Sequence, residues 1–518
     1  MSFASAIAAR QAAPPNRAMI TASIMTATVM IVLDTTIANV ALPHMQGSLN
    51  ASQDQVTWIL TSYIVASAIL TPLTGWLSGR LGRKNLFLIS VAGFTIASAL
   101  CGVATSITEI VLFRLLQGVF GAPMLPLSQS VLLDINPREK HGQAMAIYGM
   151  GVMVGPILGP VVGGWLTEAY SWRWCFFINV PVGILAMTGI LLFIHGEKHD
   201  DPPKLDLAGF LLLSLGLGAL QMMLDRGQGQ DWFNSTEIWV EAALAFLGFW
   251  WAGVHMATTR RPFINRTLFK DRNFIVASVL GFFLGVMLYS TMALLPPLMQ
   301  RLMGYPALQS GLTMAPRGFG TLVIMFLIGR VIGKVDTRLL LFSGFILSAY
   351  SAWRMSQFAP GMNGTPIVIS GLIQGAAMGM LFVPLSTIAF ATMPPHLRTD
   401  ASGLFTLIRN IGSAVGISII SASQMNNIAA ARTSLVDKIS PGNTAVQLLP
   451  PQLASLSQSA LAQLDAVVGG QAAFIGYVDA FYMTALLSLG CVPLLLLLRA
   501  PKRPPSGGPQ EAPHAVMD

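Results

Sequence analysis

One carboxylate and one guanidinium draw attention because they lie inside long apolar segments. Asp34 lies in the run 18–42, about 16 residues from its start, which is about 24 Å along a helix. Arg114 lies near the start of the run 110–132. An ionisable residue inside hydrocarbon is costly and indicates a functional site. Desolvation favours the protonated form of a carboxylate and a nearby cation favours the charged form. The pair is therefore predicted to communicate and to handle protons. The alternative is a static ion pair between two helices, because burial alone does not make an ion pair functional.

Five further polar residues in apolar runs are candidates for lining a substrate cavity: Asn39, Gln117, Gln374, Arg409 and Asn410. Arg409 is expected near the middle of the membrane, where it needs an anion or a carbonyl oxygen to face. The four amides can line a cavity or form ordinary hydrogen bonds between helices. The 27 Met and 27 Phe residues suit a deformable apolar cavity, but lipid-facing surfaces contain the same residues, so composition identifies no ligand.

Composition places the chain in the membrane class. Of 518 residues, 53% are hydrophobic and 10% are charged, and the mean hydropathy is +0.64. Apolar runs of roughly 20 residues, enough to cross about 30 Å of hydrocarbon, recur from end to end. We predict an all-α membrane protein with fourteen spans, near 18–42, 56–78, 85–103, 110–132, 142–165, 174–195, 207–225, 237–257, 273–295, 311–332, 339–358, 365–389, 400–423 and 475–498.

Lys and Arg collect in alternate loops, as is typical of loops that stay in the cytoplasm. The tails 1–17 and 499–518 belong to the basic set, so both termini are predicted to be cytoplasmic. The net charge of +8 then follows from topology and calls for no nucleic-acid partner.

Enzymatic, metal and ATP-driven chemistry find no support in the sequence. The three cysteines, Cys101, Cys175 and Cys491, lie far apart in apolar runs, and no HExxH, CxxC or GxxxxGK[ST] pattern occurs. We expect no enzyme activity and no cofactor, and no work driven by ATP.

The run 142–165 carries glycines at four-residue spacing together with two prolines: Gly151, Gly155, Pro156, Gly159, Pro160 and Gly163. Each proline would cost a soluble helix about 3 kcal/mol, whereas membrane helices tolerate proline. Small residues at this spacing let two backbones pack closely. The ridge predicts a closely packed helix that can move, and the alternative is a surface for helix dimerisation.

An internal repeat divides the chain. The segment from Gly75 to Phe87 is echoed 254 residues later by the segment from Gly329 to Leu341. A repeated block of six spans is typical of transporters with two halves and a substrate site between them. The predicted parts are a tail 1–17, a six-helix bundle 18–195, two inserted helices within 196–272, a second bundle 273–498 with an outward loop 424–474, and a tail 499–518.

These motifs resemble those of the Emr-type (EmrB/QacA-like) fourteen-span drug:proton antiporters of the major facilitator superfamily. The resemblance rests on the Gly-Pro ridge and on the segments Leu33 to Pro43, Gly75 to Lys84, Arg114 to Gly118, Phe177 to Pro181, Leu224 to Gly227, Asp231 to Phe233 and Leu295 to Pro296. It implies a major facilitator fold in the bacterial inner membrane and proton-driven export of hydrophobic drug-like molecules by alternating access. It also implies a periplasmic adaptor similar to EmrA and an outer-membrane channel similar to TolC.

The resemblance also implies roles for single residues. It assigns Asp34 to transport and Arg114 to proton handling. It assigns a latch between the halves to the loop residues Gly75, Arg80, Gly82, Arg83 and Lys84, whose basic side chains could instead serve only to set the topology. The chain has Gly79 where the family usually carries an acid, so a salt bridge often assigned to that acid cannot form.

Several alternatives stay open at this stage. Leu449, Leu453, Leu456 and Leu461 predict a short amphipathic helix in the outward loop, which either docks on a partner or caps the transporter. The function could also be export of one metabolite or siderophore, or ligand sensing without transport.

Overall fold

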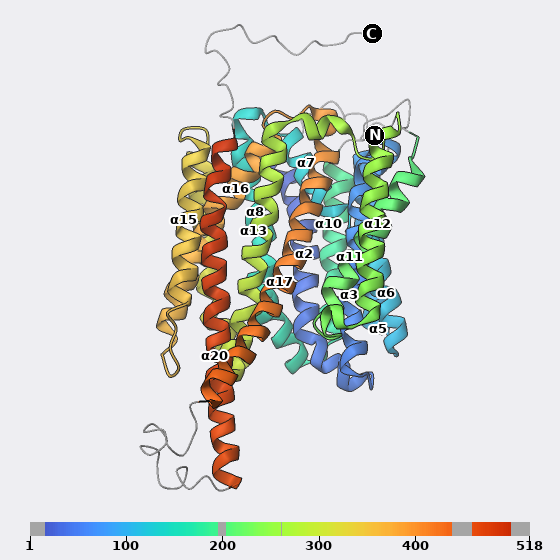
Figure 1. Cartoon of the computed structure of the whole chain (residues 1–518). Coiled ribbons are helices and arrows are strands. Elements are labelled where there is room, and N and C mark those ends of the chain that lie inside the picture. The colour runs from blue at the N-terminus through green and yellow to red at the C-terminus, as the bar shows by residue number, and fades with distance from the viewer. Residues whose placement is uncertain (1–15, 195–203, 261, 438–457, 499–518) are drawn as a thin grey trace, which may run out of the picture.

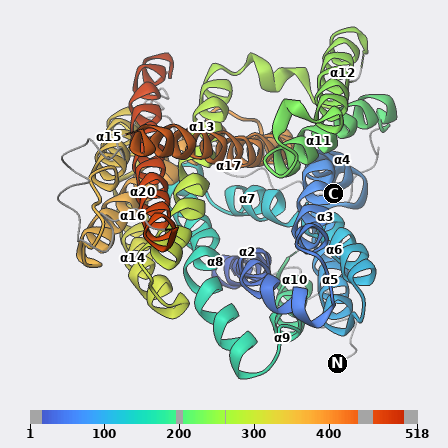
Figure 2. The ribbon, with the colours of Figure 1, turned by 60° about the horizontal axis from the view of Figure 1, so that its bottom comes forward.

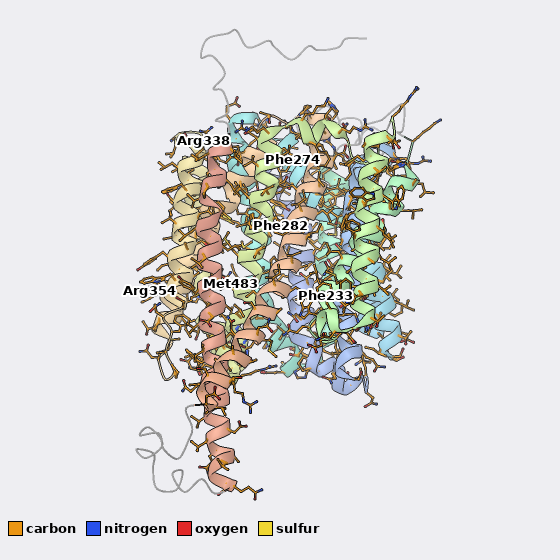
Figure 3. The ribbon with its side chains drawn as sticks, viewed as in Figure 1. Phe233, Phe274, Phe282, Arg338, Arg354 and Met483 are labelled. Carbon is orange, nitrogen blue, oxygen red and sulfur yellow. The ribbon has the colours of Figure 1, made fainter. Side chains whose placement is uncertain are left out.

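The computed structural model describes residues 16–194, 204–260, 262–437 and 458–498. Its regular structure there is helical, apart from one isolated bridge between Ile332 and Val335. Thirteen of the described helices are long and apolar enough to cross a membrane, and the long helices run side by side (Figure 1). The remaining expected span is the 19-residue helix α15 (Thr337–Met355). Arg338 and Arg354 lie near its two ends (Figure 3), where long basic side chains can reach the membrane surface.

The first half of the chain forms six segments, some of which are broken where proline removes a backbone donor. Pro72 lies in the turn that joins two helices of the second segment, and Pro123 precedes the second helix of the fourth. The segments are α2 (Arg17–Ser48); α3 (Gln53–Leu70) with η1 (Thr71–Leu73) and α4 (Thr74–Leu81); α5 (Arg83–Val103); α6 (Ile107–Gly121) with α7 (Met124–Asp134); α8 (His141–Ala169); and α9 (Trp174–Phe177) with α10 (Asn179–Phe193).

The second half repeats this plan. Its segments are α13 (Arg272–Pro297) with η5 (Leu298–Leu302); α14 (Ala307–Val331); α15; α16 (Thr365–Phe390) followed by η6 (Pro395–Leu397); α17 (Arg398–Val436); and α20 (Gln458–Gly490) with η7 (Val492–Leu497). The described parts of the expected outward loop 424–474 are helical, because α17 continues to Val436 and α20 begins at Gln458. Leu461 lies in α20, whereas Leu449, Leu453 and Leu456 lie outside the described residues, as do most of the two tails.

The two helices between the halves are α11 (Leu207–Arg226) and α12 (Thr236–Thr258), with η3 (Trp232–Asn234) between them and η4 (Arg266–Lys270) after them. They pack on each other, and α11 also contacts α3 and α17. Asp206, at the start of α11, links the two helices through a 2.8 Å contact with Nε2 of His255 on α12. Its carboxylate also accepts hydrogen bonds from the backbone N–H groups of Gly209 and Phe263, both at 3.0 Å. Burial opposes the charged form, but these hydrogen bonds outweigh it and hold the pKa of Asp206 below its ordinary value.

The two ends of the bundle differ in charge. The start of α2 and the end of η7 lie at one end of the bundle (Figure 1). We call it the basic end because the alternating helix directions bring the end of α4, the start of α5 and the start of α17, with Arg80, Arg83, Lys84 and Arg398, to the same side. The other end is called the opposite end, and there α20 projects beyond the neighbouring helices (Figure 1), with the end of α17 packed beside it. An exposed ion pair of 2.6 Å between Arg432 and Asp465 joins these two helices.

In each half the first and fifth segments pack closely on each other, α2 on α8 and α13 on α17. The two helices of each pair lie side by side in Figure 2. In the second half, a Cβ added at Gly412 or Gly416 would collide with the backbone of Phe282 or Val286 on α13. Figure 3 places Phe282 midway along that helix. The internal repeat is thus visible in the packing as well as in the sequence.

The glycine ridge of α8 packs inside the chain, against α2. An added Cβ would collide with Met25 at Gly151, with Val32 at Gly155 and with Thr36 at Gly159. At Gly163 it would lie 3.3 Å from Ile37. The Thr36 hydroxyl also donates to the carbonyl oxygen of Gly155 at 3.1 Å. The ridge therefore brings the α8 backbone against the part of α2 that carries Asp34.

Replacing Gly155 with valine is expected to lower the apparent melting temperature of the detergent-purified protein, because overpacking a tight contact costs about 1–3 kcal/mol. Gly164, also on α8, has no atom within 4 Å of an added Cβ, so Gly164→Val is the matched control. Equal melting temperatures for the two variants would contradict the claim that close backbone approach stabilises the α2–α8 pair.

Candidate functional site

An ion pair sealed from water lies within the first half. Arg114, on α6, donates from Nη1 to Oδ2 of Asp34, on α2, at 2.6 Å. Both side chains are at most 1% exposed. The structure thus brings the two residues that were expected to handle protons into direct contact.

Two amides complete the surroundings of the carboxylate. Gln117 Nε2 and Asn179 Nδ2 both donate to Oδ1 of Asp34, at 2.8 Å and 2.7 Å. Gln117 also accepts from Arg114 Nη1 at 2.7 Å, and Asn179 donates to the Ser98 hydroxyl at 2.9 Å. We call Asp34, Arg114, Gln117 and Asn179 the Asp34 network.

Three donors face the Asp34 carboxylate: the guanidinium of Arg114 and the amide N–H groups of Gln117 and Asn179. Arg114 has other contacts that can hold it, because Nε donates to the carbonyl oxygen of Ile59 at 3.2 Å and the guanidinium lies 4.4 Å from the Tyr63 ring centre. Arg114 therefore bridges α2 and α3.

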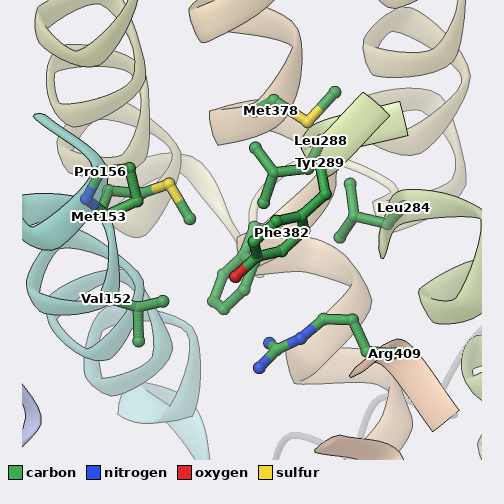
Figure 4. Close-up of a pocket in the computed structure, with 9 residues that line it drawn as sticks. All are labelled: Val152, Met153, Pro156, Leu284, Leu288, Tyr289, Met378, Phe382 and Arg409. Carbon is green, nitrogen blue, oxygen red and sulfur yellow. The ribbon is translucent and has the colours of Figure 1, made fainter. Parts of the chain in front are cut away.

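A cavity lies between the halves, where α8 of the first half faces α13, α16 and α17 of the second (Figure 4). Its volume of about 30 Å³ holds a few water molecules rather than a drug. The lining residues are mostly apolar: Val152, Met153, Pro156, Leu284, Leu288, Tyr289, Met378, Phe382 and Arg409. Pro156 directly follows Gly155 of the ridge, so α8 joins this cavity to α2.

Arg409 is one of the five predicted cavity residues and lines this cavity. Its guanidinium lies 5.4 Å from the Phe382 ring centre, and Figure 4 shows it pointing toward Phe382 from α17. Among the residues that the structure describes, no carboxylate forms an ion pair with Arg409. Arg114, by contrast, forms an ion pair with Asp34.

The other four predicted cavity residues lie elsewhere. Gln117 belongs to the Asp34 network, and Gln374 is buried, donating to the Thr291 hydroxyl at 2.7 Å. Asn39 and Asn410 lie on exposed faces of α2 and α17 and are not among the lining residues. Helix phase explains the difference, since neighbouring positions on a helix point about 100° apart.

Two buried residues were missed by the sequence analysis. Asn179 lies in the Phe177 to Pro181 motif, so an amide in an apolar run was the available signal. Arg317, on α14, is 8% exposed, and its Nη2 donates to the carbonyl oxygen of Leu288 at 3.2 Å. A lone arginine inside the run 311–332 gave the same signal as Arg409.

Asp134 joins the halves at the basic end. At the end of α7 it pairs with Arg83 of the first half and, at 2.5 Å, with Arg398 of the second. Arg83 also donates to the carbonyl oxygen of Pro395 at 3.5 Å, and the hydroxyls of Ser130 and Thr399 lie 2.8 Å apart. We call Arg83, Asp134 and Arg398 the basic-end latch.

The remaining loop residues support this end in different ways. Gly75 packs on Asp400 of α17, where an added Cβ would collide with the carboxylate. Gly82 has a φ of 77°, which lets the chain turn between α4 and α5. Arg80 lies against Trp76 of its own helix, and Lys84 donates to the carbonyl oxygen of Leu191 at 3.0 Å. Of the three basic loop residues, Arg83 contacts the other half.

Comparisons with known proteins agree with this architecture. The family model described as the Major Facilitator Superfamily matches residues 24–417. The multidrug export protein EmrB of Haemophilus influenzae is 37% identical over 489 residues, covering 93% of this chain and 96% of that protein. The fatty acid resistance protein FarB of Neisseria gonorrhoeae is 36% identical, covering 95% and 98%. The solved structure of the proton:xylose symporter XylE superposes with a TM-score of 0.60 at 15% identity, covering 92% and 96%, which is a likeness of fold.

Arg114→Gln is expected to destabilise the protein strongly, because removing one partner of a buried ion pair costs about 3–5 kcal/mol. The double variant Asp34→Asn with Arg114→Gln should recover much of that loss, since no unpaired charge stays buried. Apparent melting temperatures in detergent measure both effects. Additive losses in the double variant would show that the two residues do not act as a unit.

Asp134→Asn is expected to let the basic ends separate, because it removes both ion pairs of the basic-end latch. Spin labels at the exposed positions Leu81 and Lys334, in a chain without other cysteines, would report longer and broader distances. Asp465→Asn, which removes an ion pair at the opposite end, is the control and should leave the distances unchanged. An unchanged distribution in Asp134→Asn would rule out the latch.

Proposed function

This chain belongs to the EmrB-type multidrug exporters of the major facilitator superfamily, and we propose that it exports hydrophobic, drug-like molecules in exchange for protons. Residues 24–417 match the superfamily model, and the EmrB of Haemophilus influenzae is 37% identical over 93% of the chain. The named relatives act in multidrug export and in fatty acid resistance. Transport by alternating access between the halves is the mechanism that the fold suits.

The proposed coupling to protons rests on the buried Asp34 network. A carboxylate that is 1% exposed and held by Arg114, Gln117 and Asn179 can bind a proton only when the guanidinium withdraws. One proton that moves inward across 100 mV supplies roughly 2.3 kcal/mol. The proton gradient is thus the proposed energy source, without a cofactor.

Coupling between proton and substrate is proposed to run through α8. The helix packs backbone to backbone on α2 at Gly155, and its next residue, Pro156, lines the cavity between the halves. A shift of α2 on protonation of Asp34 would therefore move one wall of the cavity. Proline beside close-packed glycines leaves this helix able to bend.

The basic-end latch supports alternating access. The Arg83–Asp134–Arg398 pairs join the halves at the basic end, which is expected to face the cytoplasm in the bacterial inner membrane, with both termini on that side. A cavity of about 30 Å³ must enlarge to accept a drug. Uptake from the cytoplasm would therefore require the latch to open.

The ends of α17 and α20 at the opposite end are proposed to contact a periplasmic adaptor similar to EmrA, which would lead to an outer-membrane channel similar to TolC. α20 extends past the neighbouring helices at the opposite end (Figure 1) and is joined to the end of α17 by Arg432 and Asp465. Exposed side chains such as Leu461 and Val467 lie on this extension of α20.

The proposal predicts that hydrophobic dyes collapse an imposed pH gradient in proteoliposomes containing the native chain, and that Asp34→Asn abolishes this effect. Asp231→Asn, an acid-to-amide change at an exposed position, is the matched control and should retain it. A pH-sensitive dye trapped inside the vesicles provides the measurement.

The outcomes of this experiment distinguish proton antiport from the alternative functions. Equal proton movement in the native chain and in Asp34→Asn would leave Asp34 as a static partner of Arg114. Dye binding without proton movement in any variant would overturn antiport by the chain alone and favour sensing or an obligatory adaptor.

A further inference from the structure

The inserted pair of helices contacts both halves of the bundle through the last turn of α11. The carbonyl oxygen of Leu224 accepts a hydrogen bond from the Ser418 hydroxyl of α17, in the second half, at 2.5 Å. The next residue, Asp225, accepts through Oδ2 from the Thr61 hydroxyl of α3, in the first half. Figure 2 shows α11 beside both helices, and Figure 3 places Phe233, in the link that follows, toward the opposite end. The inserted pair therefore joins the halves at a distance from the basic-end latch.

Arg226, the last residue of α11, is held from two sides. Its guanidinium lies 5.6 Å from the ring centre of Trp58 on α3 and pairs with Glu237 on α12. Glu241, about one turn further along α12, lies 3.9 Å from the same guanidinium and is 7% exposed. A buried carboxylate is costly without a cation, so α12 fixes Arg226 against α3. We call the three consecutive residues 224–226 the insert clasp.

The turn of α3 that receives the insert clasp also holds Arg114. Trp58 and Thr61 are three residues apart and share one side of α3, which faces the insert. Ile59 and Tyr63 are four residues apart and share another side. The carbonyl oxygen of Ile59 accepts from Arg114 Nε at 3.2 Å, and the Tyr63 ring centre lies 4.4 Å from the guanidinium. Less than two turns of one helix thus separate the insert clasp from the arginine of the Asp34 network.

We propose that the insert clasp positions the turn of α3 that holds Arg114 and ties that position to the second half, so that the inserted pair couples movement of the halves to the Asp34 network. This inference rests on the proposed function and identifies Asp225 as a positioning residue for it. Because α3 and α17 belong to different halves, separation of the halves at the opposite end either breaks a contact of the clasp or moves α3 with it. Contacts that differ between two states are what couple two sites, and here they change the hold of α3 on Arg114.

Asp225→Ala is expected to loosen the coupling of protons to transport. In proteoliposomes with an imposed pH gradient, the number of protons moved for each ethidium transported should fall about fivefold, the factor that loss of one hydrogen bond implies. Asp225→Asn keeps an oxygen that accepts from Thr61 and should retain the native ratio. Glu168→Ala, which removes an exposed acid near the end of α8, is the control and should also retain it. A pH-sensitive dye trapped in the vesicles and the fluorescence of ethidium provide the two rates.

Two further variants test the separate links and serve where Asp225→Ala does not fold. Thr61→Val keeps the shape of the side chain without its donor and should reproduce the loss. The double variant of Thr61→Val with Asp225→Ala should lose no more than either single variant, because both remove the same bond; additive losses would overturn the link to α3. Ser418→Ala should also lower the ratio, and a native ratio there would overturn the tie to the second half.

Hydrogen exchange measured by mass spectrometry on the purified full chain tests the position of α3 without transport. Backbone amides of residues 58–66 should exchange faster in Asp225→Ala than in the native chain and in Glu168→Ala, since a less constrained segment opens more often. Unchanged exchange would overturn the proposal. Native transport of ethidium with an unchanged proton ratio in Asp225→Ala would also overturn it and leave the proposed function standing. Faster exchange in Asp225→Ala, with no proton movement by the native chain, would instead count against the proposed function and leave the clasp as the element that positions α3.

Discussion

A carboxylate in hydrocarbon must find a cation and hydrogen-bond donors, and much of the first half of this protein is arranged around that requirement. Asp34 on α2 receives its donors from α6 and α10, while Arg114 is held from behind by α3. These three bonds join helices far apart in the chain. Removing any one partner would leave a buried charge or a buried amide unsatisfied, which is costlier than the net value of the bond itself. The network therefore specifies how these four helices approach one another.

The close backbone contact between α2 and α8 links the position of the Asp34 network to the cavity between the halves. Because Gly155 lies on Val32, α8 cannot shift relative to α2 without losing the fit, and Pro156 transmits the position of α8 to the cavity wall. The same plan recurs in the second half, where Gly412 and Gly416 lie on α13. Two similar helix pairs thus face one another across the cavity. They differ in charge, since Arg114 has a carboxylate partner and Arg409 has none among the described residues.

Some residues of the site could be found from the sequence and others could not. Asp34, Arg114 and Arg409 were visible because a charge in an apolar run is rare and expensive. Asn179 and Gln117 carry only the weaker signal of an amide in an apolar run, which is ordinary in membrane helices. Gln117 was therefore placed in the cavity and Asn179 was missed, because their role depends on which carboxylate lies opposite. Asn39 and Asn410 were placed in a cavity but lie on exposed faces, because a position in the run does not give the direction of the side chain.

The sequence by itself determined the membrane class, the positions of the spans, the two repeated halves with an insert between them, and the family. Those properties follow from hydropathy, charge distribution and local motifs, all of which can be read directly from the amino-acid sequence. Only the tertiary structure decided that the glycine ridge packs on α2, that Asp134 joins Arg83 to Arg398 across the halves, and that Arg409 lines the cavity between the halves. These are contacts between segments that lie tens to hundreds of residues apart, and they depend on helix rotation and depth, which hydropathy does not encode.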